Sequence, residues 1–186
     1  MARLSKKPPM SRETLLPLLA SHVLGSGLGQ ASLRPLAKAA GTSDRMLLYH
    51  FGSKEALITD LLGFLARSYA GALDAVLAGE RAATRGQALA RILQHARAPE
   101  MRPFMQLWWE IVAGSARGVE GYRPAAQAMM GELLGWLEGQ MPEGDPDPAG
   151  GARYLLTLIE GTLMLSAIGH EASARDGLLA SGLAAA

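Results

Sequence analysis

The sequence predicts an all-α protein, in which a three-helix head with a helix-turn-helix precedes a larger helical body. Apolar residues recur at three- and four-residue spacing through most of the 186 residues, and alternating strand patterns are absent. Proline- and glycine-rich breaks separate the periodic segments. We therefore divide the chain into a basic disordered arm (residues 1–12), a helical head (13–56) and a helical body (57–186).

The first helix of the head contains a proline. A helix that began at Ser11 would hold Pro17 in its interior, where the missing N–H removes a hydrogen bond. We therefore expect the helix to begin near Thr14, or to bend at Pro17.

The next two helices of the head are short and joined by a tight turn. Ser32 can cap the first of them, and Pro35 falls in its first turn, where no N–H is needed. Gly41 stands where the chain must adopt a positive φ angle, and Thr42 and Ser43 offer the cap of the second helix. Two short helices joined at such a turn form a helix-turn-helix, whose second helix enters the DNA major groove.

The second of these helices has one apolar face. Leu47, Leu48 and Phe51 can face inward, which leaves a polar outer face. A third helix starts at Ser53, and its apolar repeat continues to about residue 78. Further helices are expected over residues 87–97, 99–113, 122–141, 152–169 and 172–183, with a linker at 142–151.

Charge and composition narrow the function. Residues 1–60 carry a net charge of +4 and the rest −3, so the head is the basic part, as phosphate contact requires. The absence of cysteine excludes disulfides and thiolate chemistry, and no catalytic or phosphate-loop motif is present. We expect no enzyme activity, metal or cofactor. The apolar stretch 155–169 is short and contains Glu160, which indicates a cytoplasmic protein without a membrane span.

The head resembles the TetR family of bacterial transcriptional regulators. The matching motifs are Leu33 to Ala37, Ala40 to Ser43, Tyr49 to Phe51 and Lys54 to Leu57, and the resemblance covers residues 12–62 closely. It implies binding of double-stranded DNA at a palindromic operator by a homodimer, in most members as a repressor. The body would then bind an effector and form the dimer.

The DNA-binding residues are expected around the turn and the second helix. The Arg45 guanidinium suits a guanine edge, while Met46 and Thr42 can touch a thymine methyl group. Asp44 can accept from cytosine or stabilise the helix end. Tyr49, His50 and Lys54 would reach phosphates. The full predicted set is Arg34, Thr42, Ser43, Asp44, Arg45, Met46, Tyr49, His50 and Lys54.

The body supplies two further expectations. Its most apolar helix must be buried, either in the core or against a partner. The resemblance implies a dimer interface at the last two helices, with the candidates Tyr154, Leu155, Leu158, Ile159, Thr162, Leu165 and Ser166. Methionine and tryptophan bulk indicates a pocket for a small apolar effector: Met101, Phe104, Met105, Trp108, Trp109, Glu110, Met129, Met130 and Met164. Two alternatives stay open at this point, a helical protein–protein interaction module and a DNA-binding regulator without an effector.

Overall fold

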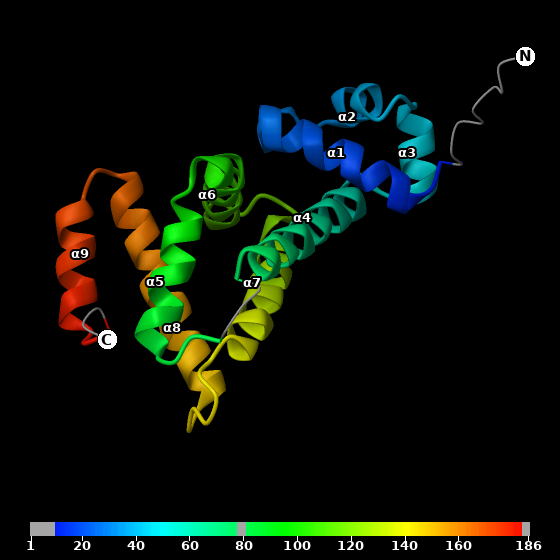
Figure 1. The fold of residues 1–186 in the computed structure, drawn as a ribbon. Coiled ribbons are helices and arrows are strands. Elements are labelled where there is room, and N and C mark those ends of the chain that lie inside the picture. The colour runs from blue at the N-terminus through cyan, green and yellow to red at the C-terminus, as the bar shows by residue number, and fades with distance from the viewer. Residues whose placement is uncertain (1–9, 78–80, 184–186) are drawn as a thin grey trace, which may run out of the picture. The chain divides into compact units, whose positions relative to one another are not determined.

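The computed structural model describes residues 10–77 and 81–183, and over these ranges the chain is helical without strands, which confirms the predicted fold class. The elements (Figure 1) are α1 (Arg12–Ser26), the 3-10 turn η1 (Leu28–Gln30), α2 (Leu33–Ala39), α3 (Asp44–Phe51), α4 (Lys54–Leu77), α5 (Arg85–Ala96), the 3-10 turn η2 (Pro99–Met101), α6 (Arg102–Ala116), α7 (Tyr122–Gly139), α8 (Pro148–Ala167) and α9 (Glu171–Ala180). The predicted basic arm with Arg3, Lys6 and Lys7 lies outside the described residues, apart from its last three positions.

The chain forms two compact units. The first unit comprises residues 10–66 and 103–129, and the second unit comprises residues 67–102 and 130–183 as far as they are described. The first unit therefore contains α1, α2 and α3, the beginning of α4, nearly all of α6 and the first part of α7. Helices α5, α8 and α9 belong to the second unit.

One apolar cluster fills the first unit. Leu19, Leu36, Leu47 and Leu61 bring the helices of the head onto a common core, and all four are fully buried. Leu107 and Ile111 of α6 complete the same cluster, with Phe104, Trp108, Tyr122 and Met129 packed against it. Each buried leucine of this kind stabilises the fold by about 1.5–3 kcal/mol. The head is therefore held both by its own helices and by α6.

The first helix begins earlier than predicted. Ser11 is the N-cap of α1, and a reciprocal pair of hydrogen bonds with Thr14 forms a capping box. The expected start near Thr14 is therefore wrong, and Pro17 lies inside the helix. Pro17 and Glu13 are both exposed, so water can reach the Glu13 carbonyl that a residue with an N–H would have bonded.

The predicted linker at 142–151 is partly helical. Helix α8 already begins at Pro148, because the Asp147 carboxylate caps it by accepting from the Gly150 N–H at 2.9 Å. The glycines at 150 and 151 therefore lie in the first turn of the helix. The other body helices lie close to their predicted ranges, although α6 extends to Ala116 rather than ending at 113.

The second unit has its own buried residues. Leu89 and Ile92 of α5, Leu155 and Ile159 of α8 and Ala174 of α9 are all buried. Helix α8 packs against both α5 and α9. By length and composition, one described helix, over residues 54–75, could cross a membrane, although apolar core helices pass the same test. Leu57, Leu61 and Leu65 from this helix lie in the core cluster of the first unit.

Candidate nucleic-acid interface

The turn between α2 and α3 is closed by backbone hydrogen bonds around Gly41. The Thr42 N–H donates to the Ala37 carbonyl at 2.9 Å, and the Gly41 N–H donates to the Lys38 carbonyl at 3.2 Å. This pair of bonds is the Schellman arrangement that ends a helix. Gly41 has a φ of 64°, and a Cβ there would meet open space. The glycine is therefore required by backbone conformation rather than by crowding.

One face of helix α3 packs into the core, and the opposite face is open to solvent. Ser43 caps it by accepting from the Met46 N–H at 3.3 Å. Leu47 and Phe51 are buried in the core, whereas Ser43, Asp44 and Arg45 are exposed and Tyr49 is 79% exposed. The expectation that Leu48 faces inward is wrong, because its side chain is exposed. The apolar face of this helix therefore consists mainly of Leu47 and Phe51.

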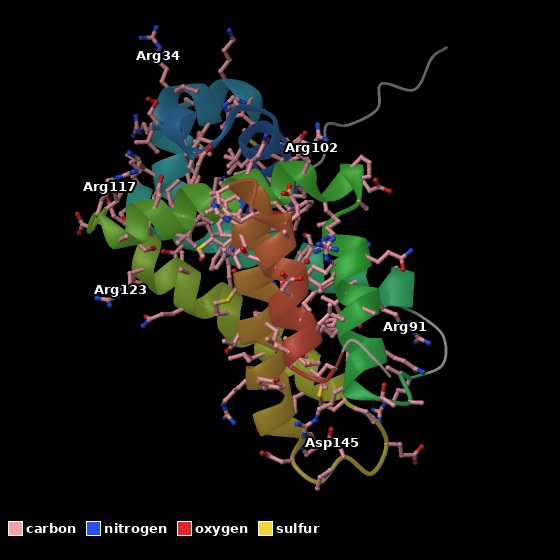
Figure 2. All side chains as sticks on the ribbon, turned by 90° about the vertical axis from the view of Figure 1, so that its left-hand side faces the viewer. Arg34, Arg91, Arg102, Arg117, Arg123 and Asp145 are labelled. Carbon is pink, nitrogen blue, oxygen red and sulfur yellow. The ribbon has the colours of Figure 1, made fainter. Side chains whose placement is uncertain are left out.

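Most side chains of the predicted DNA-binding set lie on accessible parts of α2, α3 and the start of α4. Arg34, Lys38 and Lys54 are exposed, and Arg34 projects away from α2 (Figure 2). Ser53 caps α4 by accepting from the Ala56 N–H at 3.1 Å. The pKa of the Glu55 carboxyl is lowered by the backbone N–H of its own residue and by the Ser53 hydroxyl. The start of α4 therefore favours negative charge, as a phosphate site requires.

Two members of the predicted set are more enclosed than expected. The Nε2 atom of His50 and the Oγ1 atom of Thr42 are shielded from solvent and have no hydrogen-bond partner. The Tyr49 and His50 rings meet edge to face, with centroids 5.2 Å apart. Tyr49 is therefore the more accessible of these two aromatic residues, and His50 supports it from the side.

Arg12 is a residue of this site that sequence reasoning missed. Its Nε donates to the carbonyl of His50 at 2.6 Å, and its Nη1 donates to Asp60 Oδ2 at 3.0 Å. The guanidinium also lies 5.5 Å from the centre of the Phe51 ring. The bond to His50 places a positive charge on a carbonyl in the last turn of α3, where the helix dipole favours it. Arg12 thus fixes the end of α3 relative to α1 and α4.

The predicted dimer residues fall on two faces of α8. Leu155, Ile159 and Thr162 are buried within the single chain, so they belong to the core of the second unit. The Ser166 Oγ is likewise shielded and has no hydrogen-bond partner. Tyr154, Leu158 and Leu165 are at least partly exposed. These last three are the apolar residues of the set that remain accessible to a partner.

The predicted effector residues also lie in different parts of the structure. Phe104, Trp108 and Met129 pack against the core of the first unit, while Trp109 and Glu110 line a groove beside the end of α1. Met105 is half-buried. In the second unit Met101 is buried, Met130 is half-buried and Met164 is exposed. Of the predicted set, Trp109 and Glu110 are thus the two residues that line this groove.

The second unit contains two half-buried polar side chains that lie near each other, Tyr69 and Glu160. Burial, together with the charge of Glu160, raises the pKa of Tyr69 to about 12. Tyr69 comes from α4 and Glu160 from α8.

Within the described residues, no group of acidic and histidine side chains could hold a metal ion.

Comparison with known proteins identifies the head. Residues 23–61 match the family model described as bacterial regulatory proteins, tetR family. These residues include the turn at Gly41, the whole of α3 and the capped start of α4. No curated protein matches the chain.

Solved structures match over nearly the whole chain. A protein from Streptomyces coelicolor A3(2), assigned as a transcriptional regulator, is 25% identical, with a TM-score of 0.70 over 91% of this chain and 96% of the other. The multidrug binding protein EbrR, in complex with proflavin, is 20% identical, with a TM-score of 0.64 over 90% and 97%. A protein from Rhodococcus sp., assigned to the TetR family of transcriptional regulators, is 21% identical, with a TM-score of 0.61 over 91% and 95%.

The family match lies on the structural parts that suit DNA binding, and the same fold continues through the body. The helix-turn-helix holds an exposed polar edge on α3, and the solved structures share the arrangement of the remaining helices. Residues 23–61 thus match the TetR family of bacterial regulatory proteins, and the chain shares its fold with solved transcriptional regulators.

Proposed function

We propose that this regulator binds a palindromic DNA operator as a homodimer and acts as a repressor that a small effector releases. The observation that carries the proposal is the exposed edge of α3 formed by Asp44, Arg45 and Tyr49. Its opposite face is locked into the core by Leu47 and Phe51, so the edge is presented on a rigid support. We further propose that the protein is cytoplasmic and has no catalytic activity.

In the proposed complex, the first turn of α3 enters the major groove. Arg45 reads a guanine through its two-pronged guanidinium, and Met46 contacts a thymine methyl group. Tyr49 and Arg34 bind phosphates, and Lys54 does so together with the free N–H groups at the start of α4. Phosphate contacts fix the position of the head, whereas Arg45 supplies sequence preference.

The test is selection of random duplex DNA by the purified protein, repeated with Arg45→Ala. We expect an enriched palindrome, and a loss of preference at one base of each half-site in the variant, worth about 1–3 kcal/mol. Arg34→Ala is the matched control, because loss of a phosphate contact weakens all sequences alike. Absence of enrichment at low salt would overturn the proposal in favour of a protein–protein interaction module.

The dimer is proposed to form through the outer face of α8. Tyr154, Leu158, Leu165 and Ile168 recur at helical spacing and are at least partly exposed. Gly161 lies on the same stripe, and a Cβ there would meet no atom within 4 Å. An apolar stripe of this kind on a surface helix indicates a partner surface.

Sedimentation of two variants distinguishes the exposed stripe from the buried residues beside it. Leu158→Glu should yield a folded monomer. Thr162→Glu should instead unfold the second unit, because the buried position would receive an unpaired charge. A Leu158→Glu protein that remains a dimer would place the interface elsewhere.

We further propose that the effector binds in the second unit, beside Tyr69 and Glu160. A few placed polar groups orient a ligand in most small-molecule sites, and these two half-buried side chains lie close enough for the charge of Glu160 to affect the pKa of Tyr69. The related EbrR structure holds proflavin, which makes a flat aromatic molecule a suitable first probe. Proflavin should release the operator DNA, and Glu160→Gln should weaken that release.

A further inference from the structure

A groove of about 480 Å³ lies within the first unit, between the end of α1 and the first half of α6. Residues 23–27 form one wall, and the other wall includes Pro103, Gln106, Trp109 and Glu110. Its volume falls within the range of small-molecule sites, which is roughly 300–1,000 Å³. The groove is therefore large enough for an organic molecule.

The groove is negatively polarised. Glu110 is the one charged side chain among its lining residues. The opposite wall is the C-terminal turn of α1, which carries the negative end of the helix dipole and has no basic residue. Both walls of the groove therefore favour a positively charged ligand.

The Glu110 carboxylate is held in place. Its Oε2 accepts a hydrogen bond from the Leu28 N–H at 2.6 Å, immediately after α1 ends. Its Oε1 lies beside Gly27, where an added Cβ would be only 2.6 Å away. Burial and the charge of Glu110 also raise the pKa of the neighbouring Tyr122. The Glu110 side chain is exposed, and the bond from the Leu28 N–H holds its carboxylate at the edge of the groove.

Aromatic and apolar surface adjoins this charge. Trp109 is half-buried and lines the groove, together with Leu24, Pro103 and Leu107. An indole face attracts cations through its quadrupole, and more strongly where water is excluded. Gly25 and Gly27 leave the backbone of the α1 wall uncovered, and a Cβ at Gly25 would meet no atom within 4 Å.

We propose that this groove binds a small organic cation with apolar or aromatic substituents, of the quaternary ammonium or phosphonium class. Glu110 pairs with the positive charge, Trp109 covers one side of the molecule, and the carbonyl end of α1 lies opposite. The site lies within the first unit and uses none of the side chains assigned to operator DNA. It is also separate from the effector site proposed beside Tyr69 and Glu160.

Calorimetric titration of the full chain with tetraphenylphosphonium tests the proposal. Tetraphenylborate, which has nearly the same shape and the opposite charge, is the matched ligand control. We expect the cation to bind once per chain, and Glu110→Gln to weaken binding about tenfold. Glutamine can still accept from the Leu28 N–H, so the fold should be preserved. Glu120→Gln is the control variant, since Glu120 is exposed and lies outside the groove.

A second variant blocks the groove from its other wall. Gly25→Leu places a side chain in the open space and should abolish binding of the cation while the helix remains intact. Binding of tetraphenylphosphonium that is unchanged in both Glu110→Gln and Gly25→Leu would overturn the proposal, as would equal binding of tetraphenylborate or no binding of the cation. None of these outcomes would affect operator selection, so failure here is distinguishable from failure of the proposed function.

Discussion

Two arginines each join distant parts of one unit, and their surroundings differ. Arg12 in the first unit bonds the His50 carbonyl and Asp60, with side-chain exposures of 51% for Arg12 and 36% for Asp60. Arg85 in the second unit bonds both oxygens of Asp145, at 2.6 and 2.7 Å, and the Asp147 carbonyl at 3.0 Å. The side chain of Asp145, in the turn between α7 and α8 (Figure 2), is only 3% exposed.

Because their surroundings differ, we expect Arg12 mainly to position α3 and Arg85 mainly to stabilise the fold. Exposed ion pairs contribute about 0–1 kcal/mol, so the bonds of Arg12 serve mainly to hold the end of α3 in one place. The Arg85 pair is two-pronged and largely enclosed, and Asp145 also accepts from the Asp147 N–H at 2.9 Å. Because Asp147 caps α8, Arg85 joins the start of α5 to the start of α8. We therefore expect Arg12 to affect DNA binding and Arg85 to affect folding.

The largest effect should come from Arg85→Ala. The substitution leaves the enclosed Asp145 carboxylate without its cation and removes the donor to the Asp147 carbonyl, so the melting temperature should fall by several degrees. Arg12→Ala is the matched comparison and should change it by no more than about 2–4 °C. Calorimetric melting of both variants checks the contrast, and equal losses would show that enclosure does not distinguish the two arginines.

Arg12→Ala should reduce operator affinity about tenfold, because the recognition helix loses the contact that caps its last turn. Fluorescence anisotropy with labelled operator measures this loss. Asp60→Asn is the control, since it removes the ion pair and keeps the bond from Arg12 to the His50 carbonyl. If Asp60→Asn loses as much affinity as Arg12→Ala, the ion pair rather than the helix end is what positions α3.

The head was more predictable from sequence than these arginine contacts. Ser43, Gly41 and Ser53 act within a few residues of their own positions, so local rules identified their roles correctly. Arg12 and Asp60 are 48 positions apart, and Arg85 and Asp145 are 60 apart. Such pairings depend on tertiary packing, which the sequence does not display.

The same limit explains the mixed outcome for the body. Helical spacing predicted the helices, but it could not decide which face of α8 turns inward. Leu155 and Leu158 look alike in sequence, yet the first is fully buried and the second is not. Likewise, neighbouring tryptophans separate, since Trp108 packs on the core and Trp109 lines the groove.

A pH dependence follows from the Arg85 pair. Its hydrogen bond lowers the pKa of Asp145 from the ordinary value of 3.8 to about 2. A carboxyl whose folded pKa is lowered contributes stability fully above its unfolded pKa and loses it as the pH falls toward the folded value. The difference in urea midpoint between the natural protein and Asp145→Asn should therefore shrink between pH 5 and pH 2. A difference that stays constant across this range would contradict the assignment.

The smallest effect should come from the glycine against which Arg85 packs. A Cβ at Gly151 would lie 2.8 Å from the guanidinium carbon of Arg85, and Asp145 prevents the guanidinium from moving away freely. Gly151→Ala should destabilise the protein by about 1 kcal/mol, whereas Gly135→Ala, in open space on α7, should stabilise it by up to about 1 kcal/mol. Urea unfolding measures both.

The decisive comparison places Gly151→Ala in the Arg85→Ala background. With the guanidinium gone, the new methyl group meets no obstacle from Arg85, and alanine should then stabilise the first turn of α8 as it does elsewhere in a helix. A change of sign between the two backgrounds would show that the arginine contact, rather than helix propensity, requires glycine at this position. The same sign in both would mean that Arg85 adapts to the methyl group, and that its contact with Asp145 is looser than the geometry indicates.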